Sequence, residues 1–208
     1  MRARAKSGPA DRNGEKSLAR SIQADTEWYA FESQIRELYG RVAYTHKTHE
    51  KMAERKAALQ HSIKLIQIVL SAISATGAVS VLVTDAAWAK VVTVLFATAT
   101  LVVSAYVKDL DPGALAQKHR QIAADLWNIR EAYLSLLTDL RDEAQSLEDL
   151  KGRRDDMQNR LHALYKSAPH TDGAAYMKAQ YALQKNEDLT FSEKEIDAFL
   201  PKPLKRGK

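Results

Sequence analysis

Three side chains of metal-binding type lie close together on one predicted helix. His46, His49 and Glu50 fall within one helical turn, close to the spacing of metal ligands on a helix. A metal site would need completion by His61, by His119 or by another subunit. The alternative is a solvated, titratable helix face among charged neighbours, and we favour it. We therefore expect neither a metal nor any other cofactor.

The motifs of common enzyme classes are missing from the sequence. It has no Gly-rich phosphate loop, no nucleophile elbow and no pair of carboxylates in an apolar setting. It has no cysteine, which excludes thiol chemistry and disulfides. We therefore expect a protein that is not an enzyme.

Two apolar stretches without charged side chains determine the predicted architecture. One runs from Leu65 to Thr84, and the other from Val91 to Val107, extended at its start by residues 86–89. At about 1.5 Å per residue the first spans roughly 30 Å, the thickness of a bilayer's hydrocarbon core. A buried hairpin in a soluble protein is the alternative, but too little chain remains to wrap both helices. We predict membrane spans over about residues 65–84 and 88–107.

Basic residues on either side of the two spans predict the orientation. Lys and Arg residues precede the first span and follow the second, whereas the loop between them has only Lys90, close to Asp85. Short loops rich in Lys and Arg stay in the cytoplasm, so we expect both termini there and the hairpin tip outside. Trp88 and Tyr106 suit the aromatic belts at the membrane surfaces.

The two ends of the chain are basic, and the net charge is +5. Residues 1–24 combine Gly, Pro, Ser and charged residues and predict a disordered tail, and residues 202–208 form a second basic tail. Such tails could lie on an anionic leaflet, bind nucleic acid or be simply solvated. No aromatic-interleaved basic motif accompanies them, so we expect no direct binding to nucleic acid.

Apolar residues at alternating three- and four-residue steps predict long helices, over about residues 25–64 and 112–166. Asp25 is a plausible N-cap for the first, and Asp111-Pro112-Gly113 opens the second. The two helices should pack antiparallel on each other or on neighbouring subunits, and the sequence leaves both possibilities open. The packing seam contains Ile35, Leu38, Val42, Leu126, Ile129, Tyr133, Leu136 and Leu140.

Short helices are predicted over about residues 174–186 and 193–200, the latter opened by a capping box at Ser192–Glu195 and ended by Pro201. No segment has a strand pattern. The sequence predicts an all-α fold, in which residues 25–201 form a two-span domain with long heptad-patterned cytoplasmic helices.

Polar and small residues form a narrow stripe along each span. In hydrocarbon such stripes face other helices or water. They either allow close helix packing or line a hydrophilic pore made by several hairpins, and the residues leave both open. The polar members are Gln67, Ser71, Ser74, Thr93, Thr100 and Ser104.

With the hairpin and its flanks in view, the chain resembles the SLATT proteins, two-span effectors of bacterial and fungal conflict systems. The resemblance covers roughly residues 25–201 and includes no catalytic signature. It lies in Leu38-Tyr39-Gly40-Arg41 with Tyr44, in Leu126-Trp127-Asn128-Ile129-Arg130-Glu131-Ala132-Tyr133 with Leu136, Leu137 and Asp139, and in Ala175-Tyr176, Phe191-Ser192, Glu195-Ile196 and Leu200-Pro201.

The resemblance implies a homo-oligomeric effector in the bacterial inner membrane that breaches the membrane and stops growth of an infected cell. The family is thought to form pores when a partner makes or senses a nucleotide signal. We expect membrane lipids, further copies of the chain and a separate nucleotide-signalling or sensor protein as partners. The alternative is a non-conducting membrane scaffold that recruits a soluble partner.

Overall fold

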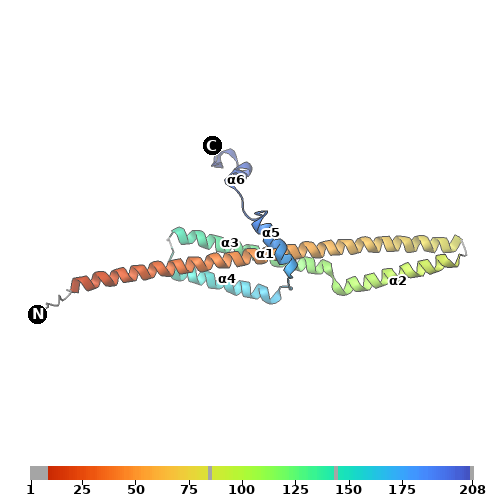
Figure 1. Cartoon of the computed structure of the whole chain (residues 1–208), viewed down its shortest axis with the longest axis horizontal. Helices are drawn as coiled ribbons and strands as arrows, with labels where there is room; N and C mark the ends of the chain where they lie inside the picture. The colour runs from red at the N-terminus through yellow and green to blue at the C-terminus, as the bar shows by residue number, and fades with distance from the viewer. Residues whose placement is uncertain (1–8, 84–85, 143–144, 207–208) are drawn as a thin grey trace. The chain divides into compact units, whose positions relative to one another are not determined.

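The computed structural model describes residues 9–83, 86–142 and 145–206, and these residues form helices and no strand. The predicted all-α fold is therefore confirmed. The elements in Figure 1 are α1 (Pro9–Val83), α2 (Ala87–Leu110), α3 (Pro112–Asp142), α4 (Leu147–Ser167), α5 (Gly173–Gln184), α6 (Glu193–Phe199) and a short 3-10 helix (Lys202–Leu204).

The chain divides into two compact units, which we describe one at a time. The first contains residues 1–43 and 126–166, and the second contains residues 44–125 and 167–208. Helices α1 and α3 each contribute one part to both units.

The first helix begins earlier than the sequence predicts. It starts at Pro9 rather than at Asp25, so the stretch expected to be disordered is helical from residue 9 to residue 24. Pro is tolerated in the first turn of a helix, and Lys16, Leu18 and Arg20 are residues with high helix propensity. Residues 1–8 of the predicted tail lie outside the described part of the chain.

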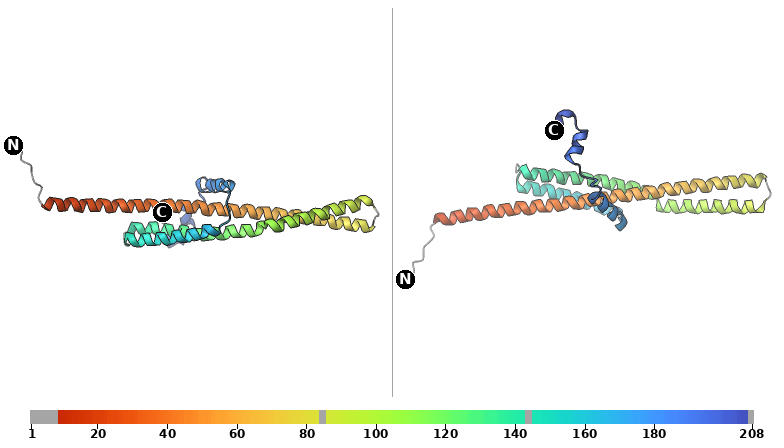
Figure 2. Two further views of the ribbon diagram at one scale, coloured as in Figure 1. Left: turned by 90° about the horizontal axis from the view of Figure 1, so that it is seen from below. Right: turned by 45° about the horizontal axis from the view of Figure 1, so that its top comes forward.

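Two helices, α3 and α4, replace the single helix predicted over residues 112–166. Ser146 caps α4: its hydroxyl accepts a hydrogen bond from the Asp149 backbone N–H at 3.2 Å and lies 2.6 Å from the Asp149 carboxylate. Serine competes with the helical backbone and favours this capping position. Figure 2 shows α3 and α4 running side by side and antiparallel, and Arg153 of α4 binds Asp139 of α3 at 2.5 Å.

The predicted packing seam lies inside the first unit. Seven of its eight residues are buried within the chain and Leu38 is half-buried, so these side chains already have intramolecular partners. Leu150 and Met157 of α4 are buried as well. Arg154 of α4 lies over the Phe31 ring of α1, 5.4 Å from its centroid, and donates a 2.9 Å hydrogen bond to Gln34.

A one-residue break separates α2 from α3 in the second unit. Asp111 has a left-handed backbone with φ of 30°, and its N–H bonds to the Val107 carbonyl at 2.9 Å. Its carboxylate accepts a 2.9 Å hydrogen bond from the Ala114 N–H, so Asp111 ends one helix and caps the next. Pro112 at the first helical position agrees with the predicted start of α3.

Leu136 and Leu134 offer a matched test of the packing in the first unit. Leu136 is completely buried, whereas Leu134 on the same helix is 45% exposed. Leu136→Ala should lower the free energy of unfolding by about 2–5 kcal/mol, because it removes buried methyl groups and leaves a cavity. Leu134→Ala should change it by less than about 0.5 kcal/mol. Urea titration of the full chain in detergent measures both, and equal effects would contradict the packing described.

Candidate functional site: the transmembrane hairpin and its base

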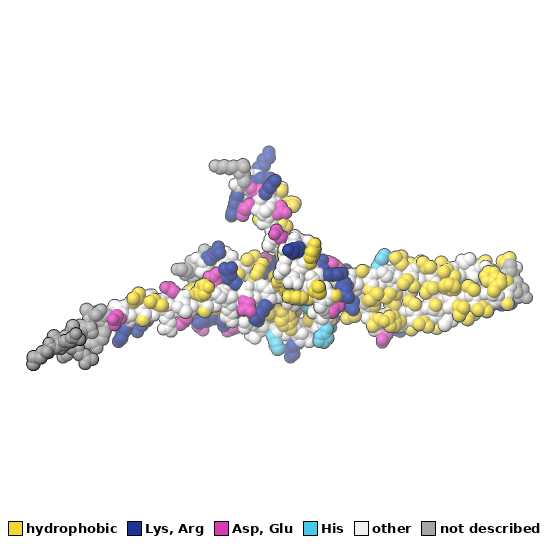
Figure 3. Space-filling view, in the orientation of Figure 1, with side chains coloured by type: hydrophobic (Ala, Val, Ile, Leu, Met, Phe, Trp, Pro, Cys, Tyr) yellow, Lys and Arg dark blue, Asp and Glu magenta, His cyan; other side chains and the backbone are white. Residues whose placement is uncertain are grey.

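The second half of α1 and helix α2 form a hairpin with an apolar outer surface. Both helices are long and apolar enough to cross a membrane, and none of the apolar window is buried inside the chain. The stretch from Leu65 to Val83 spans about 28 Å at 1.5 Å per residue, which matches a bilayer's hydrocarbon core. Figure 3 shows hydrophobic side chains over most of this hairpin. Soluble proteins rarely expose so large an apolar surface.

Contacts between small and polar side chains set the register of the hairpin. Gln67 of α1 donates a 3.1 Å hydrogen bond to the Ser104 hydroxyl of α2. Further along, Gly77 lies against Thr93, and a Cβ atom at position 77 would overlap the Thr93 hydroxyl. The absence of a side chain at Gly77 therefore permits the close approach of the two helices, as small residues do in membrane proteins.

Five of the six polar residues of the predicted stripes are half-buried in this hairpin, and Ser71 is exposed. Four of their hydroxyls donate to the carbonyl four residues earlier in the same helix, at 2.8–2.9 Å: those of Ser74, Thr93, Thr100 and Ser104. This arrangement satisfies the hydroxyls by packing and backbone bonding. The structure thus brings five of the stripe residues together between the helices and leaves Ser71 on the outer surface.

Two buried histidines meet below the hairpin, in the second unit. The Nδ1 atoms of His49 on α1 and His119 on α3 are 2.9 Å apart, and the residues are 3% and 1% exposed. One neutral imidazole must donate to the other, which requires opposite tautomers. His119 is one of the two histidines that the sequence offers to complete a metal site with His46, His49 and Glu50. His61 is exposed, and no three side chains of metal-binding type converge within the described residues.

Both histidines are held neutral by their surroundings. Burial lowers the pKa of His49 to about 4, with smaller contributions from His119 and His46. Burial also lowers the pKa of His119, together with the positive charge of Lys56, while Asp172 opposes this shift. At neutral pH the pair is therefore an uncharged contact between α1 and α3.

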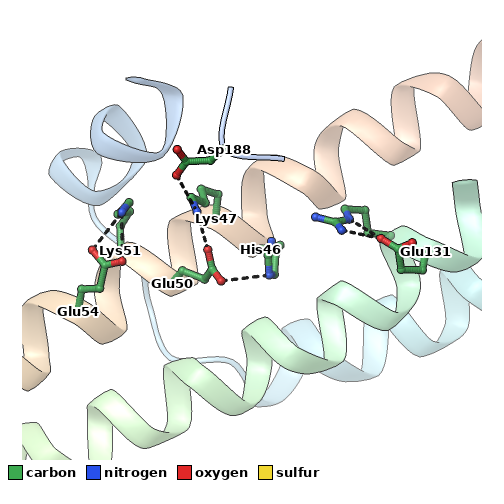
Figure 4. Close-up of polar contacts among 8 residues, drawn as sticks. His46, Lys47, Glu50, Lys51, Glu54, Glu131 and Asp188 are labelled. Atoms are coloured by element: carbon green, nitrogen blue, oxygen red, sulfur yellow. Dashed lines mark hydrogen bonds and ion pairs between the residues drawn. The ribbon is translucent and has the colours of Figure 1, made fainter. Parts of the chain in front are cut away.

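Lys47 is a buried cation on the same part of α1. Its Nζ lies 2.9 Å from Glu50 and 2.9 Å from Asp188, a residue that follows α5, as Figure 4 shows. Burial alone would lower the pKa of Lys47, but the hydrogen bonds and charges of the two carboxylates outweigh it and raise the pKa. His46 Nε2 lies 3.6 Å from the other oxygen of Glu50, so both oxygens of this carboxylate face side chains of its own helix.

Helix α5 is attached to α1 at further points. Arg55 Nη1 lies 2.6 Å from both carboxylate oxygens of Asp172, and Asp172 caps α5 by accepting from the Ala175 N–H at 2.8 Å. The backbone hydrogen bond and Arg55 lower the pKa of Asp172. Tyr44 stacks on Tyr176 with ring centroids 5.9 Å apart. These contacts were not predicted from the sequence, in which the one available signal was Asp172, a good N-cap residue directly before the helix.

Comparison with known proteins identifies one family. The model of the SMODS and SLOG-associating 2TM effector domain family 4 matches residues 31–195, which include both candidate spans, the histidine pair and α5. The resemblance noted from the sequence is thereby confirmed. No curated protein matches the chain. No solved structure matches it either.

The neutral histidine pair predicts a pH dependence of stability. The folded pKa values of both histidines lie below the ordinary value of about 6.5, and that of His49 is about 4, so below pH 6.5 the unfolded chain binds protons that the folded chain excludes. The stabilisation should be complete above pH 6.5 and should be lost as the pH falls; His49 alone, with its pKa lowered to about 4, accounts for about 3 kcal/mol of this loss. Denaturation midpoints measured in detergent between pH 7.5 and 4.5 test this.

Other groups also titrate in acid, so the comparison needs matched variants. His49→Gln should flatten the profile between pH 7 and 5, whereas His162→Gln, at an exposed position, should leave it unchanged. Identical profiles for His49→Gln and the native chain would show that the pair does not control acid stability.

Proposed function

The chain belongs to the SMODS and SLOG-associating 2TM effector domain family 4, and from this premise we propose that it is an oligomeric membrane effector of a bacterial nucleotide-signalled anti-phage or conflict system. The observation that carries the proposal is the hairpin, whose apolar surface is uncovered within the chain. Lipid or further copies of the hairpin must cover that surface. The effector would open the inner membrane and cause growth arrest or cell death.

Assembly of several copies is part of this proposal. Two helices packed against each other cannot enclose a path for water, so a pore needs hairpins from several copies. Ser71 is the polar stripe residue on the outer surface of the hairpin, where it is available to a lumen. The other five proposed lining residues occupy the contact between α1 and α2, and they would reach a lumen only after the helices rotate or separate. The proposed pore-lining residues are Gln67, Ser71, Ser74, Thr93, Thr100 and Ser104.

The orientation in the membrane follows from charge at the base of the hairpin. Because Gln67 pairs with Ser104, Lys64 and Lys108 lie at the same end of the two helices. Lys56, Lys118 and Arg120 add positive charge beyond that end. Such an excess favours the cytoplasmic side, so we propose that both termini are cytoplasmic and the tip is outside.

A separate nucleotide-signalling or sensor protein is the proposed activating partner, in keeping with an effector domain that associates with other domains. The second candidate function is a non-conducting scaffold that recruits a soluble partner. Exposed aromatic residues of the C-terminal region favour it, since Tyr181, Phe191 and Phe199 are 63%, 66% and 83% exposed.

Ion flux through reconstituted liposomes tests the pore directly. The chain has no cysteine, so a single introduced thiol can be labelled without background. A charged, water-soluble thiol reagent should block the flux of a Ser71→Cys variant but not of Ile73→Cys or Leu95→Cys, which carry apolar side chains exposed towards lipid. Normal oligomers without any flux would favour the scaffold, and equal block at all three positions would refute lining by Ser71.

Protease accessibility in intact cells tests the orientation. A cleavage site inserted between Ala86 and Ala87, at the start of α2, should be cut from outside, because the tip of the hairpin carries little positive charge. Tags at either terminus should be protected until the membrane is permeabilised. Cleavage of the tags in intact cells would reverse the assignment.

A further inference from the structure

The first part of α1 is uncovered in the described structure. Figure 2 shows it extending beyond the ends of α3 and α4, and every residue from 14 to 27 is exposed. A lone helix of about 12–15 residues is only marginally stable in water. Leu18 and Ile22 in this segment are 63% and 57% exposed, and Tyr29 just beyond it is 73% exposed. These are the side chains that a second helix would cover.

The three exposed apolar residues belong to a second heptad pattern on α1. Steps of four and three residues place them on one stripe, which differs from the face that carries the buried Phe31, Ile35 and Val42. We call this stripe the outer heptad, and its members are Leu18, Ile22, Asp25, Tyr29, Glu32 and Arg36. A narrow stripe with this spacing is typical of a helix that packs along another helix.

Small residues border the outer heptad on the side away from the buried residues. They recur every seven residues, as Ala19, Thr26, Ser33 and Gly40. A Cβ atom at position 40 would meet no described atom outside its own turn of the helix within 4 Å, so packing inside the chain does not require glycine there. Glycine inside a helix is less favourable than alanine. Small side chains allow two helices to approach closely, which a neighbouring helix would use.

Two hollows lie between α1 and α3 on the other side of the outer heptad, with volumes of about 520 and 450 Å³. Glu32 borders both of them. Leu134 and Leu137 form the apolar wall of the first, and Trp28 and Leu140 line the second. When helices pair along a heptad, side chains of one helix insert into spaces on the other. The hollows provide such spaces beside the outer heptad.

The membrane and the charges favour a second copy of the chain as the partner. Helix α1 runs without a break from Pro9 to Val83, into the first candidate span, so copies in one membrane have parallel α1 helices and present equivalent residues to each other. Arg36 lies 3.4 Å from Glu32 of its own chain, and their side chains are 68% and 43% exposed. In a parallel pair, Arg36 of each copy can also bind Glu32 of the other, so the contact is self-complementary.

We propose that the outer heptad is the surface through which the α1 helices of two copies pair in parallel. The proposal rests on the proposed function, since that function needs several copies, and it names the residues that join two of them. The contact involves few apolar side chains. Confinement of the copies to one membrane raises their local concentration and favours a contact of this size.

Disulfide formation between copies tests the pairing without reference to ion flux. The chain has no cysteine, so each variant carries a single thiol. Equivalent residues of the outer heptad lie closest to each other in a parallel pair, so full-length Ile22→Cys chains in membranes should form disulfide-linked dimers under mild oxidation. Gln23→Cys, at an exposed neighbouring position on another face of the helix, is the matched control and should give little dimer.

Substitutions in the outer heptad then separate packing from random collision. Tyr29→Asp, added to Ile22→Cys, should lower the dimer yield about tenfold, the factor for roughly 1.4 kcal/mol, because it places a charge in the contact. Asp25→Leu should raise the yield, since the two Asp25 carboxylates of a pair repel each other. Gln23→Leu adds the same side chain outside the outer heptad and should not raise it. The substituted positions are exposed, so the fold of each copy should be unaffected.

The outcomes distinguish this contact from the pore. Equal dimer yields from Ile22→Cys and Gln23→Cys, or a yield that neither Tyr29→Asp nor Asp25→Leu changes, would overturn the pairing and leave the outer heptad to a different protein. Ion flux and normal oligomers without this disulfide would keep the proposed pore and remove only this contact. A disulfide that follows the substitutions in a chain without flux would support the contact and count against the pore.

Discussion

The hydrocarbon interior of a membrane offers no hydrogen-bonding partner, and the described hairpin supplies partners for its own backbone and for four of its polar-stripe hydroxyls. Along α1 and α2 the backbone groups are paired inside each helix, and the hydroxyls of Ser74, Thr93, Thr100 and Ser104 bond to carbonyls of their own helix. The outer surface can then consist of apolar side chains. Close approach at Gly77 becomes the means of holding the helices together, because hydrophobic burial gives no advantage in lipid.

At the base of the hairpin the chain faces water, and the nature of its contacts changes. Two buried polar contacts lie here: the neutral pair of His49 and His119, and Lys47 with its two carboxylates. Each of these side chains needs a hydrogen-bonding partner at a defined position. Buried polar contacts of this kind add little net stability, but a misplaced neighbour would leave a charge or a donor unpaired. Their main effect is to specify how α3 and α5 lie on this part of α1.

Patterns along single helices made much of the fold predictable. The spans follow from the absence of charge over about 20 residues, seven of the eight seam residues are buried, and the capping box at Ser192 and Glu195 is present. The predicted helix boundaries were wrong where helix propensity competes with charge, glycine or serine. The helix propensity of residues 9–24 outweighed their charge and their glycine, and Ser146 ended a heptad-like pattern that continues on both sides of it.

The site itself was less predictable, because its contacts join distant parts of the sequence. His49 and His119 are 70 residues apart, and Arg55 and Asp172 are 117 apart. Spacing along one helix says nothing about such pairs. The sequence also grouped Ser71 with the other stripe residues, although it is exposed, and the helical geometry explains why. At about 100° per residue, a step of three from Ser71 to Ser74 turns the side chain by about 60°, which is enough to separate a half-buried residue from an exposed one.

The bonding of hydroxyls to their own helix also determines how freely the hairpin can be remodelled inside the bilayer. When α1 or α2 turns about its axis, the hydrogen bonds of Ser74, Thr93, Thr100 and Ser104 turn with it. None of these four hydroxyls has to give up its partner during such a turn. The hydrogen bond between Gln67 and Ser104 would break in such a turn, and its loss would cost little only where water or a neighbouring helix offers a replacement. A turn of either helix about its axis therefore changes which side chains face the other helix but leaves these four hydroxyls paired.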